Sequence, residues 1–403
     1  MTKPDLLFLV HRIPYPPNKG DKIRSFNLLK HLSKNYNIHL GCFVDDPFDL
    51  QYIEKLNRWC QSCHVIKQNK WLAKLVGLTG FITNKPITLP YYYSASMQAW
   101  VNKVQQQHDI DNVLVYSSSM AQYVEQPKYS ALNRIIDFVD IDSDKWRQYA
   151  RKNTGIKRWF YQREATLLQR YEQDICHAFT KSLFVSEDEA KAFRQLMPKA
   201  AEHKIQSLLN GVDTDFFKPD SQLTAVEATL PEQFIVFTGA MDYWANIDAV
   251  LWFTKQVWPK LKAQYPKLQF IIVGGNPSAE IKNVAKNQSI IVTGRVVDVR
   301  PYIQHALFAV APMLIARGIQ NKVLEAMSMN KAVICSTMAM EGINAPTDAG
   351  AKVADTAEDF FNACLAELEQ PSIQSSRQWI LNHFTWPNTL KKLDELFAHG
   401  VNK

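Results

Sequence analysis

The sequence predicts an α/β protein of two Rossmann-like domains, each with a parallel sheet covered by helices on both faces. Short apolar runs alternate with longer amphipathic segments along all 403 residues, and this alternation is typical of parallel sheets. The rhythm stops at a connector rich in Pro and Asp, residues 210–220, and then starts again. Because one domain takes about 150 residues, the length also favours two domains.

The first series of elements begins close to the amino terminus. Residues 6–10 are expected to form a strand, followed by a loop rich in Pro and Gly and a helix at 23–34. Phe26, Leu29 and Leu32 recur on one face of that helix. The other strands of this series are expected at 38–44, 113–116, 134–139 and 182–185.

The second series follows the connector. Its strands are expected at 234–238, 269–273, 290–293, 307–311 and 332–335. Ligands bind beyond the carboxyl ends of the strands in open parallel sheets, so the loops that follow the strands are the places to search. None of them is a G-x-G-x-x-G fingerprint or a Walker loop, which argues against a dehydrogenase and a P-loop kinase.

The composition, 46% hydrophobic and 21% charged residues, is that of a globular protein. Six cysteines over this length make no disulfide framework, which fits a reducing cytoplasm. Cys60 and Cys63 form a C-x-x-C without a second pair, so we expect two half-buried thiols on a helix rather than a zinc site. No signal peptide opens the chain and no apolar run is long enough to span a bilayer, so a cytoplasmic location is expected.

The net charge of +7 would suit nucleic acid, anionic lipid or a phosphorylated ligand. Residues 145–172 concentrate it, with eight Lys or Arg against two Glu and several interleaved aromatic residues. This pattern suits an anionic membrane surface, and no nucleic-acid-binding module accompanies it. An amphipathic helix with aromatics packed inside and cations outside is an equal alternative.

Several motifs occur in a specific order. They are RGIQNKVLEAM at 317–327 with NKAVICS at 330–336, NGVD at 210–213 with FKP at 217–219, FTGAMDYWAN at 237–246, VTGR at 292–295 with DVRPY at 298–302, and HFTW at 383–386. Together they resemble glycosyltransferase family four over residues 6–397. The segments HRIPYPPNKGDKIR at 11–24 and DIDSDKW at 140–146 are similar to the branch found with exosortase/PEP-CTERM exopolysaccharide loci.

This resemblance implies a GT-B fold, with the acceptor on an N-terminal domain at 1–213 and a nucleotide sugar on a C-terminal domain at 214–375. The terminal segment 376–403 is expected to cross back to the first domain. The implied activity is hexosyl transfer from a UDP- or GDP-linked donor in exopolysaccharide or cell-surface glycan synthesis, retaining and without a bound metal. The acceptor is expected to be a glycan or a lipid-linked molecule. The protein is expected to attach peripherally to the inner face of the plasma membrane and to meet the acceptor there.

The donor site is expected around the loop 317–322 and the helix that follows it. An enzyme without metal must neutralise the departing diphosphate with helix N-termini, backbone N–H groups and cations, and Arg317 and Lys322 could flank it. The resemblance makes Glu325 the acceptor of a ribose hydroxyl; the alternatives are solvated charges and a helical pair between Lys322 and Glu325. The remaining expected donor contacts are Gly239, Gly274, Arg295, Gly318, Gln320 and Asn321.

The sequence departs from the family pattern at two places. Arg317 stands where the first glutamate of the E-x7-E motif is usual, and residues 239–244 lack the usual cations. We hypothesise that Arg317, Lys322 and Arg295 supply the missing positive charge.

In the first domain, the loop with Gly20, Asp21, Lys22 and Arg24 is expected to contact the acceptor; the alternative is an ordinary turn. Asp140 is the candidate catalytic carboxylate. It belongs to a group of aspartates expected to raise one another's pKa, the others being Asp137, Asp142 and Asp144. Capping or structural roles are their alternative.

Two other classes of function stay open at this stage. One is a GT-B nucleotide-sugar epimerase, and the other is a non-catalytic scaffold that binds nucleotide sugar or glycan.

Overall fold

The computed structural model describes residues 3–223, 230–315, 319–372 and 375–398. The chain forms two compact units, here called the first and second domain. The first domain comprises Met1–Leu208 with Leu390–Lys403, and the second comprises Leu209–Thr389. Both are α/β, with every strand pair parallel.

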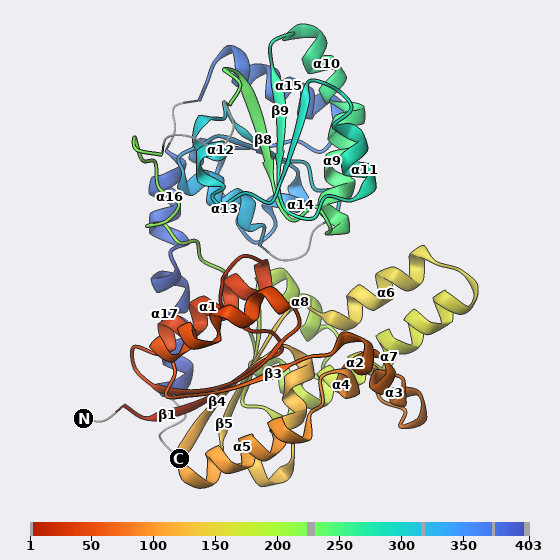
Figure 1. Cartoon of the computed structure of the whole chain (residues 1–403), viewed down its shortest axis with the longest axis vertical. Coiled ribbons are helices and arrows are strands. Elements are labelled where there is room, and N and C mark those ends of the chain that lie inside the picture. The colour runs from red at the N-terminus through yellow and green to blue at the C-terminus, as the bar shows by residue number, and fades with distance from the viewer. Residues whose placement is uncertain (1–2, 224–229, 316–318, 373–374, 399–403) are drawn as a thin grey trace. The chain divides into compact units, whose positions relative to one another are not determined.

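The first domain has a sheet in the order β3-β2-β1-β4-β5-β6-β7 (Figure 1). Its strands are β1 (Asp5–Val10), β2 (Asn37–Val44), β3 (Ser62–Lys67), β4 (Ile110–Tyr116), β5 (Asn133–Val139), β6 (Lys181–Phe184) and β7 (Ile205–Ser207). The strand order reverses between β1 and β4: successive strands are added outward from β1 to β3 on one side and outward from β4 to β7 on the other. Cys63 lies on β3 and Cys60 precedes that strand, so the expectation that both lie on a helix is wrong.

The helices of this domain are α1 (Gly20–Leu32), α2 (Lys70–Gly77), α3 (Thr79–Ile82), α4 (Thr88–Tyr91), α5 (Ala95–Gln107), α6 (Asp142–Lys152), α7 (Gly155–Ala178) and α8 (Glu187–Arg194). Helix α1 starts three residues before the predicted position, and Asp21 in its first turn favours that start. Figure 1 shows α6 and α7 as a helical hairpin that extends away from the sheet.

The second domain has a sheet in the order β10-β9-β8-β11-β12-β13. Its strands are β8 (Phe234–Thr238), β9 (Gln269–Val273), β10 (Ile290–Gly294), β11 (Ala309–Ala311), β12 (Val333–Cys335) and β13 (Ala351–Val353). Its helices are α9 (Trp244–Gln256), α10 (Trp258–Gln264), α11 (Ala279–Val284), α12 (Arg300–His305), α13 (Asn321–Ser328), α14 (Thr337–Met340), α15 (Ala357–Glu369) and α16 (Ser376–His383). Helices α9 and α11 lie on one side of β8 and β9, and α12 and α13 on the other (Figure 1).

The last helix, α17 (Trp386–Ala398), begins in the second domain and ends in the first. Its part after residue 389 packs on the first domain, where Leu390, Leu393 and Phe397 are fully buried. His31 Nε2 lies 2.9 Å from Asp394 Oδ1, and Lys392 Nζ donates to the Ser207 carbonyl at 2.8 Å.

The crossings between the domains differ from the expected 213/214 and 375/376. Val212 forms a parallel bridge with Thr385, and Arg377 donates hydrogen bonds to the carbonyls of Phe217 and Ser328. These bonds hold residues 209–213 and α16 in the second domain, so the chain crosses after Leu208 and again after Thr389.

Candidate active site

The donor-side candidates lie in the second domain, where loops follow the carboxyl ends of the strands. Lys322 is the second residue of α13, and its Nζ donates to the side-chain oxygen of Asn246 at 2.8 Å. The amine also lies 5.0 Å from the centre of the Phe237 ring and 3.6 Å from Met313 Sδ. The Lys322 cation is thus held at the start of α13 by residues of β8, of α9 and of the segment after β11.

Lys322 and Glu325 share an environment that disfavours both charges. Each side chain keeps part of its surface accessible, but surrounding protein atoms desolvate its charged end. This burial lowers the pKa of Lys322 to about 8, against the opposing effect of Glu325. Burial likewise raises the pKa of Glu325 to about 7, against the opposing effect of Lys322. Both groups therefore titrate near neutral pH, as is common at functional sites.

Two glycines allow the loops after β8 and β9 to touch. A Cβ on Gly274 would lie 1.7 Å from the Gly239 carbonyl oxygen, so no other residue fits at position 274. A Cβ on Gly239 would lie 2.7 Å from the Asn246 amide nitrogen. The two loops are joined by a hydrogen bond from the Met241 N–H to the Gly275 carbonyl at 2.9 Å. This close approach keeps Asn246 in place for Lys322.

The other expected donor contacts lie on neighbouring loops. Arg295 is exposed just after β10, and its Cβ is 3.6 Å from the Cβ position of Gly275. Gln320 is the N-cap residue of α13, and Asn321 accepts a hydrogen bond from the Asn210 amide at 3.4 Å. Arg317 and Gly318 lie outside the described residues.

Asn246 is a site residue for which sequence reasoning assigned no role. It is buried, it binds Lys322 through its oxygen, and its amide donates to the Ala240 carbonyl at 2.9 Å. It ends the motif at 237–246, which is the signal that could have identified it. The 76 residues between Asn246 and Lys322 hid the contact.

In the first domain, a polar cluster follows the carboxyl ends of β1 and β2. Arg12 donates to Asp21 at 2.5 Å and to Asp45 at 3.0 Å, and His11 Nε2 lies 3.6 Å from Asp21. Burial opposes ionisation of Asp21, but the hydrogen bond from His11 and the charge of Arg12 lower its pKa. His11 stacks on Tyr116, and His11 Nδ1 is buried without a hydrogen-bond partner among the described residues.

His11 and Arg12 are thus cluster members that sequence reasoning left unassigned, although both begin the motif at 11–24. Asp21 belongs to the same cluster, and its contact with the acceptor stays a prediction. Gly20 opens α1, and a Cβ there would meet no atom within 4 Å. Nothing in the backbone therefore requires glycine at this position.

Lys22 and Arg24 are buried ion-pair partners and do not face an open site. Lys22 Nζ donates to Asp49 at 2.8 Å, and Arg24 makes a two-pronged contact with Asp137, through Nε at 2.7 Å and Nη2 at 3.1 Å. All four side chains are nearly inaccessible. The expectation that Lys22 and Arg24 contact the acceptor is therefore corrected: their cations neutralise buried carboxylates, whose loss of a partner costs about 3–5 kcal/mol.

Asp140 follows β5 at a backbone turn. Val139 has a φ of 70°, a left-handed conformation that strains a β-branched residue. Ser117, after the neighbouring strand β4, has a φ of 79°. Such strain often marks functional sites. The Asp140 carboxylate pairs with Lys145 Nζ at 2.9 Å.

Asp140 and the aspartates near it are paired with cations. Asp137 pairs with Arg24, Asp140 and Asp142 share Lys145, and Asp144 pairs with Arg147 at 3.4 Å. Burial, rather than the other carboxylates, is the main cause that raises the pKa of Asp137.

Residues 145–172 form parts of α6 and α7 rather than one helix. Trp146 contacts Tyr149, Phe160 and Tyr161, so these aromatics pack between the two helices. Trp159 instead remains exposed and stacks against Phe81 of α3. Among the described residues, no helix is long and apolar enough to cross a membrane.

Residues 232–370 match a protein-family model described as Glycosyl transferases group 1. The chain carries a glycosyltransferase domain. The match covers the second domain from β8 to the end of α15, and so includes Asn246, Lys322 and Glu325. A comparison with curated protein sequences finds no match.

Solved structures similar to the whole chain have the GT-B fold. HepE from Anabaena in complex with UDP is 14% identical with a TM-score of 0.67, and the match covers 98% of this chain and 100% of that one. Sucrose-phosphate synthase from Thermosynechococcus elongatus is 16% identical with a TM-score of 0.72, over 99% of both chains. WaaG, a glycosyltransferase involved in lipopolysaccharide biosynthesis, is 13% identical with a TM-score of 0.64, over 97% and 99%. The predicted fold class, two Rossmann-like domains with parallel sheets as in GT-B proteins, is confirmed.

Proposed function

We propose that this protein transfers a sugar from a UDP- or GDP-linked donor to a glycan or lipid-linked acceptor in exopolysaccharide or cell-surface glycan synthesis, as a family-four enzyme of the exosortase-associated branch. The observation that carries the proposal is Lys322, held by Asn246 at the start of α13 inside the matched glycosyltransferase domain. HepE, of similar fold, has been solved with UDP and with UDP-glucose.

In this proposal the second domain binds the donor. The first N–H groups of α13 have no partner within the helix and favour an anion, and Lys322 adds a positive charge beside them. The diphosphate lies there, while Glu325 accepts a hydrogen bond from the ribose. Arg295, Gln320 and Asn321 complete the contacts, and Arg317 and Gly318 belong to the same proposed site.

The chemistry is the breaking of the bond between the sugar and the diphosphate. Negative charge grows on the leaving diphosphate, and a cation that is already in place stabilises that charge without rearrangement. Asp140, which pairs with Lys145, is the proposed base that takes the proton of the attacking hydroxyl. We propose that the hydroxyl attacks on the same face that the diphosphate leaves, so that transfer proceeds with retention, and that no metal is needed.

The test uses the purified protein with a panel of UDP- and GDP-sugars. A donor that binds the native state must raise its melting temperature, and the best donor is then assayed for transfer and slow hydrolysis. Release of UDP or GDP that Lys322→Ala abolishes supports the proposal. Binding without turnover would favour a scaffold, and conversion of the donor into its epimer would favour an epimerase.

We also propose that the protein attaches to an anionic membrane through a surface formed by α2, α3 and the first half of α7, here called the α2–α3–α7 face. Apolar side chains are unusually exposed there: Ile82 by 88%, Ile156 by 85% and Trp71 by 68%. The helices contact one another, since Arg163 donates to the Gly80 carbonyl at 2.7 Å and lies over the Phe81 ring.

Exposed cations border the apolar residues of this face. They are Lys74, Lys157 and Arg158. Aromatic and aliphatic groups next to cations match the boundary between acyl chains and anionic headgroups. An exposed apolar face of this kind marks an interaction site, and the neighbouring positive charge favours an anionic bilayer as the partner.

A further inference from the structure

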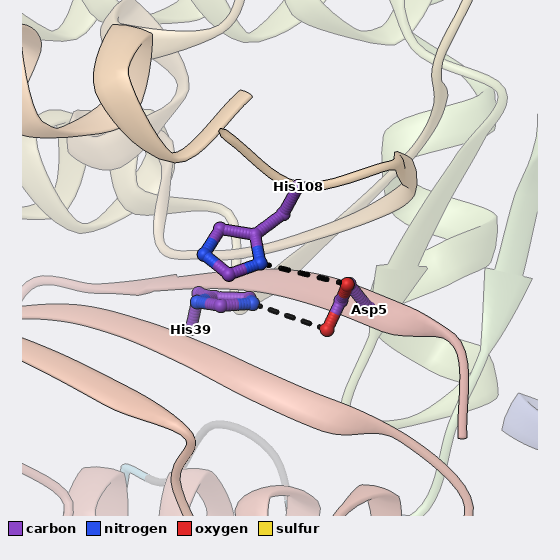
Figure 2. A group of neighbouring side chains, drawn as sticks. All are labelled: Asp5, His39 and His108. Atoms are coloured by element: carbon purple, nitrogen blue, oxygen red, sulfur yellow. Dashed lines mark hydrogen bonds and ion pairs between the residues drawn. The ribbon is translucent and has the colours of Figure 1, made fainter. Parts of the chain in front are cut away.

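Asp5, His39 and His108 form a compact group of three potential metal ligands (Figure 2). One ligand atom from each lies within 4.8 Å of those from the other two. His39 Nε2 is 3.2 Å from Asp5 Oδ1, and His108 Nδ1 is 3.7 Å from Asp5 Oδ2. Figure 2 shows both rings turned toward the same carboxylate.

The parallel sheet brings the three residues together. Asp5 is the first residue of β1, His39 is the third of β2, and His108 ends α5 just before β4. Leu7 is the partner of His39 across the sheet, so Asp5, two residues before Leu7, lies on the same face as His39. This edge holds the amino ends of the strands, opposite the edge with His11, Asp21 and Asp140.

A hydrogen bond with Ser62 orients the buried ring of His39. Its Nδ1 lies 2.8 Å from the Ser62 hydroxyl, and the ring is fully buried. When Nδ1–H donates to Ser62, the lone pair of Nε2 points toward Asp5. A hydrogen bond on the second nitrogen is the usual support of a histidine that binds metal.

The spacing also matches a metal site. With metal–ligand bonds of about 2.0–2.1 Å, a tetrahedral ion separates its ligand atoms by roughly 3.3 Å. The two nitrogen–oxygen distances here are close to that value, although they involve different oxygens of Asp5: His39 Nε2 lies 3.2 Å from Oδ1, and His108 Nδ1 lies 3.7 Å from Oδ2. Two imidazoles and one carboxylate form a donor set that Zn²⁺ accepts.

We propose that Asp5, His39 and His108 bind one Zn²⁺ ion, with water in the fourth position. The ion joins the end of α5 to the first two strands and thereby stabilises the first domain. The site is separate from the proposed donor site in sequence and domain, and it takes no part in sugar transfer.

The test uses untagged protein that has been treated with EDTA and then freed of the chelator. Zn²⁺ is titrated by calorimetry, and Co²⁺ is added separately because its visible absorption reports tetrahedral coordination. We expect one tight site per chain, a Co²⁺ spectrum typical of tetrahedral coordination, and a rise in melting temperature with Zn²⁺.

The variants are chosen so that folding does not decide the result. His39 is left intact because it is buried; His108→Ala and Asp5→Asn change partly exposed side chains. Each should weaken Zn²⁺ binding at least tenfold and remove the thermal shift, while His177→Ala, an exposed histidine of the same domain, should change neither. Equal Zn²⁺ affinity in wild type and His108→Ala would overturn the proposal and leave a hydrogen-bonded His–Asp–His cluster. UDP binding by all variants keeps this outcome distinct from a failure of the proposed function.

Discussion

Lys322 has its amine fixed before any ligand arrives. Asn246 accepts its hydrogen bond, the Phe237 ring lies under its charge, and Glu325 stands one turn further along α13. Glu325 is the carboxylate among these neighbours, but no ion pair within 4.0 Å involves Lys322 among the described residues. The amine is therefore available to an anion that approaches the start of the helix.

Replacing Lys322 with Ala should lower kcat more than it weakens donor binding. The negative charge on the diphosphate grows in the transition state, so the lost cation matters most there. A loss of about 10²–10³ in kcat is expected by analogy with the removal of one stabilising donor. Steady-state kinetics with the best donor give the answer, and an unchanged kcat with a weaker donor Kd would assign Lys322 to ground-state binding only.

Glu325→Ala should weaken donor binding by about 1–3 kcal/mol, the cost of losing a hydrogen bond to a charged group. Glu325→Gln keeps an acceptor oxygen and should recover part of the loss. Calorimetry with UDP measures both variants. Affinity equal to wild type in Glu325→Ala would refute the assignment.

The affinity for UDP should depend on pH through the same two residues. Lys322, with a pKa of about 8, loses its charge as pH rises, so affinity should fall above pH 8. Glu325, with a pKa of about 7, loses its negative charge as pH falls and becomes a weaker acceptor, so affinity should also fall below pH 7. Lys322→Arg keeps its charge at high pH and should remove the alkaline decrease. An alkaline decrease that persists in this variant would mean that another group causes it.

Helix α7 serves two purposes along its length. Its second half is buried against the sheet of the first domain, where Leu168, Glu172 and Ile175 are inaccessible. Its first half extends beyond the sheet and carries exposed Ile156 and Trp159. Of the two interpretations of residues 145–172, the one with packed aromatics fits most of these side chains, which lie between α6 and α7. The start of α7 borders the apolar face of α2 and α3, where membrane attachment stays a proposal.

Vesicle binding should require anionic lipid and weaken as salt rises. Each basic residue near an anionic surface contributes about 1 kcal/mol, screened over about 8–10 Å at physiological salt. Replacing Lys74, Lys157 and Arg158 with Gln should abolish co-sedimentation with phosphatidylserine vesicles. Turnover on a soluble acceptor should remain.

The control for this experiment removes the same charge elsewhere. Lys267, Lys282 and Lys286 are exposed in the second domain, and their replacement with Gln should leave vesicle binding intact. Arg163 is not a suitable target, because its contacts with Gly80, Phe81 and Glu164 hold α3 on α7. Indifference of the wild type to anionic vesicles at low salt would mean that the α2–α3–α7 face has another partner.

The strands of both sheets were largely predictable, and the exceptions have physical causes. Buried strands such as β8 and β9 are continuous apolar runs, and the predicted bounds match. Strand β3 is half exposed at the sheet edge and reads SCHVIK, so it lacks such a run. Strands β7 and β13 have three residues each and read IQS and AKV, so they lack the apolar run that marks the equally short β11 and β12.

The candidate site was predictable only where a motif marked it. Lys322 and Glu325 follow from the family resemblance, and their assignment stays a prediction. Lys22 and Arg24 looked like loop cations because their partners lie 27 and 113 residues away, and only the folded chain reveals those ion pairs. The Zn²⁺ ligands are spread over three segments and have no spacing that a motif could capture.

At the scale of the whole molecule, donor transfer and the proposed zinc site should respond differently to a chelator. Transfer should survive EDTA, because the proposed chemistry uses Lys322 and the start of α13 in place of a metal. The melting temperature should fall if Zn²⁺ is bound to Asp5, His39 and His108. Loss of activity in EDTA at temperatures well below melting, restored by Mg²⁺ or Mn²⁺, would contradict the metal-independent mechanism.

The two crossings of the chain, after Leu208 and after Thr389, have a consequence for synthesis on the ribosome. The second domain is one continuous segment, so all of its strands are present once residue 389 has been made. The first domain still lacks Leu390, Leu393 and Phe397 at that moment, and these side chains are fully buried in its final core. Domains made first usually fold first. In this protein the first domain is begun first but completed last, and its core stays partly exposed until the second domain has been translated.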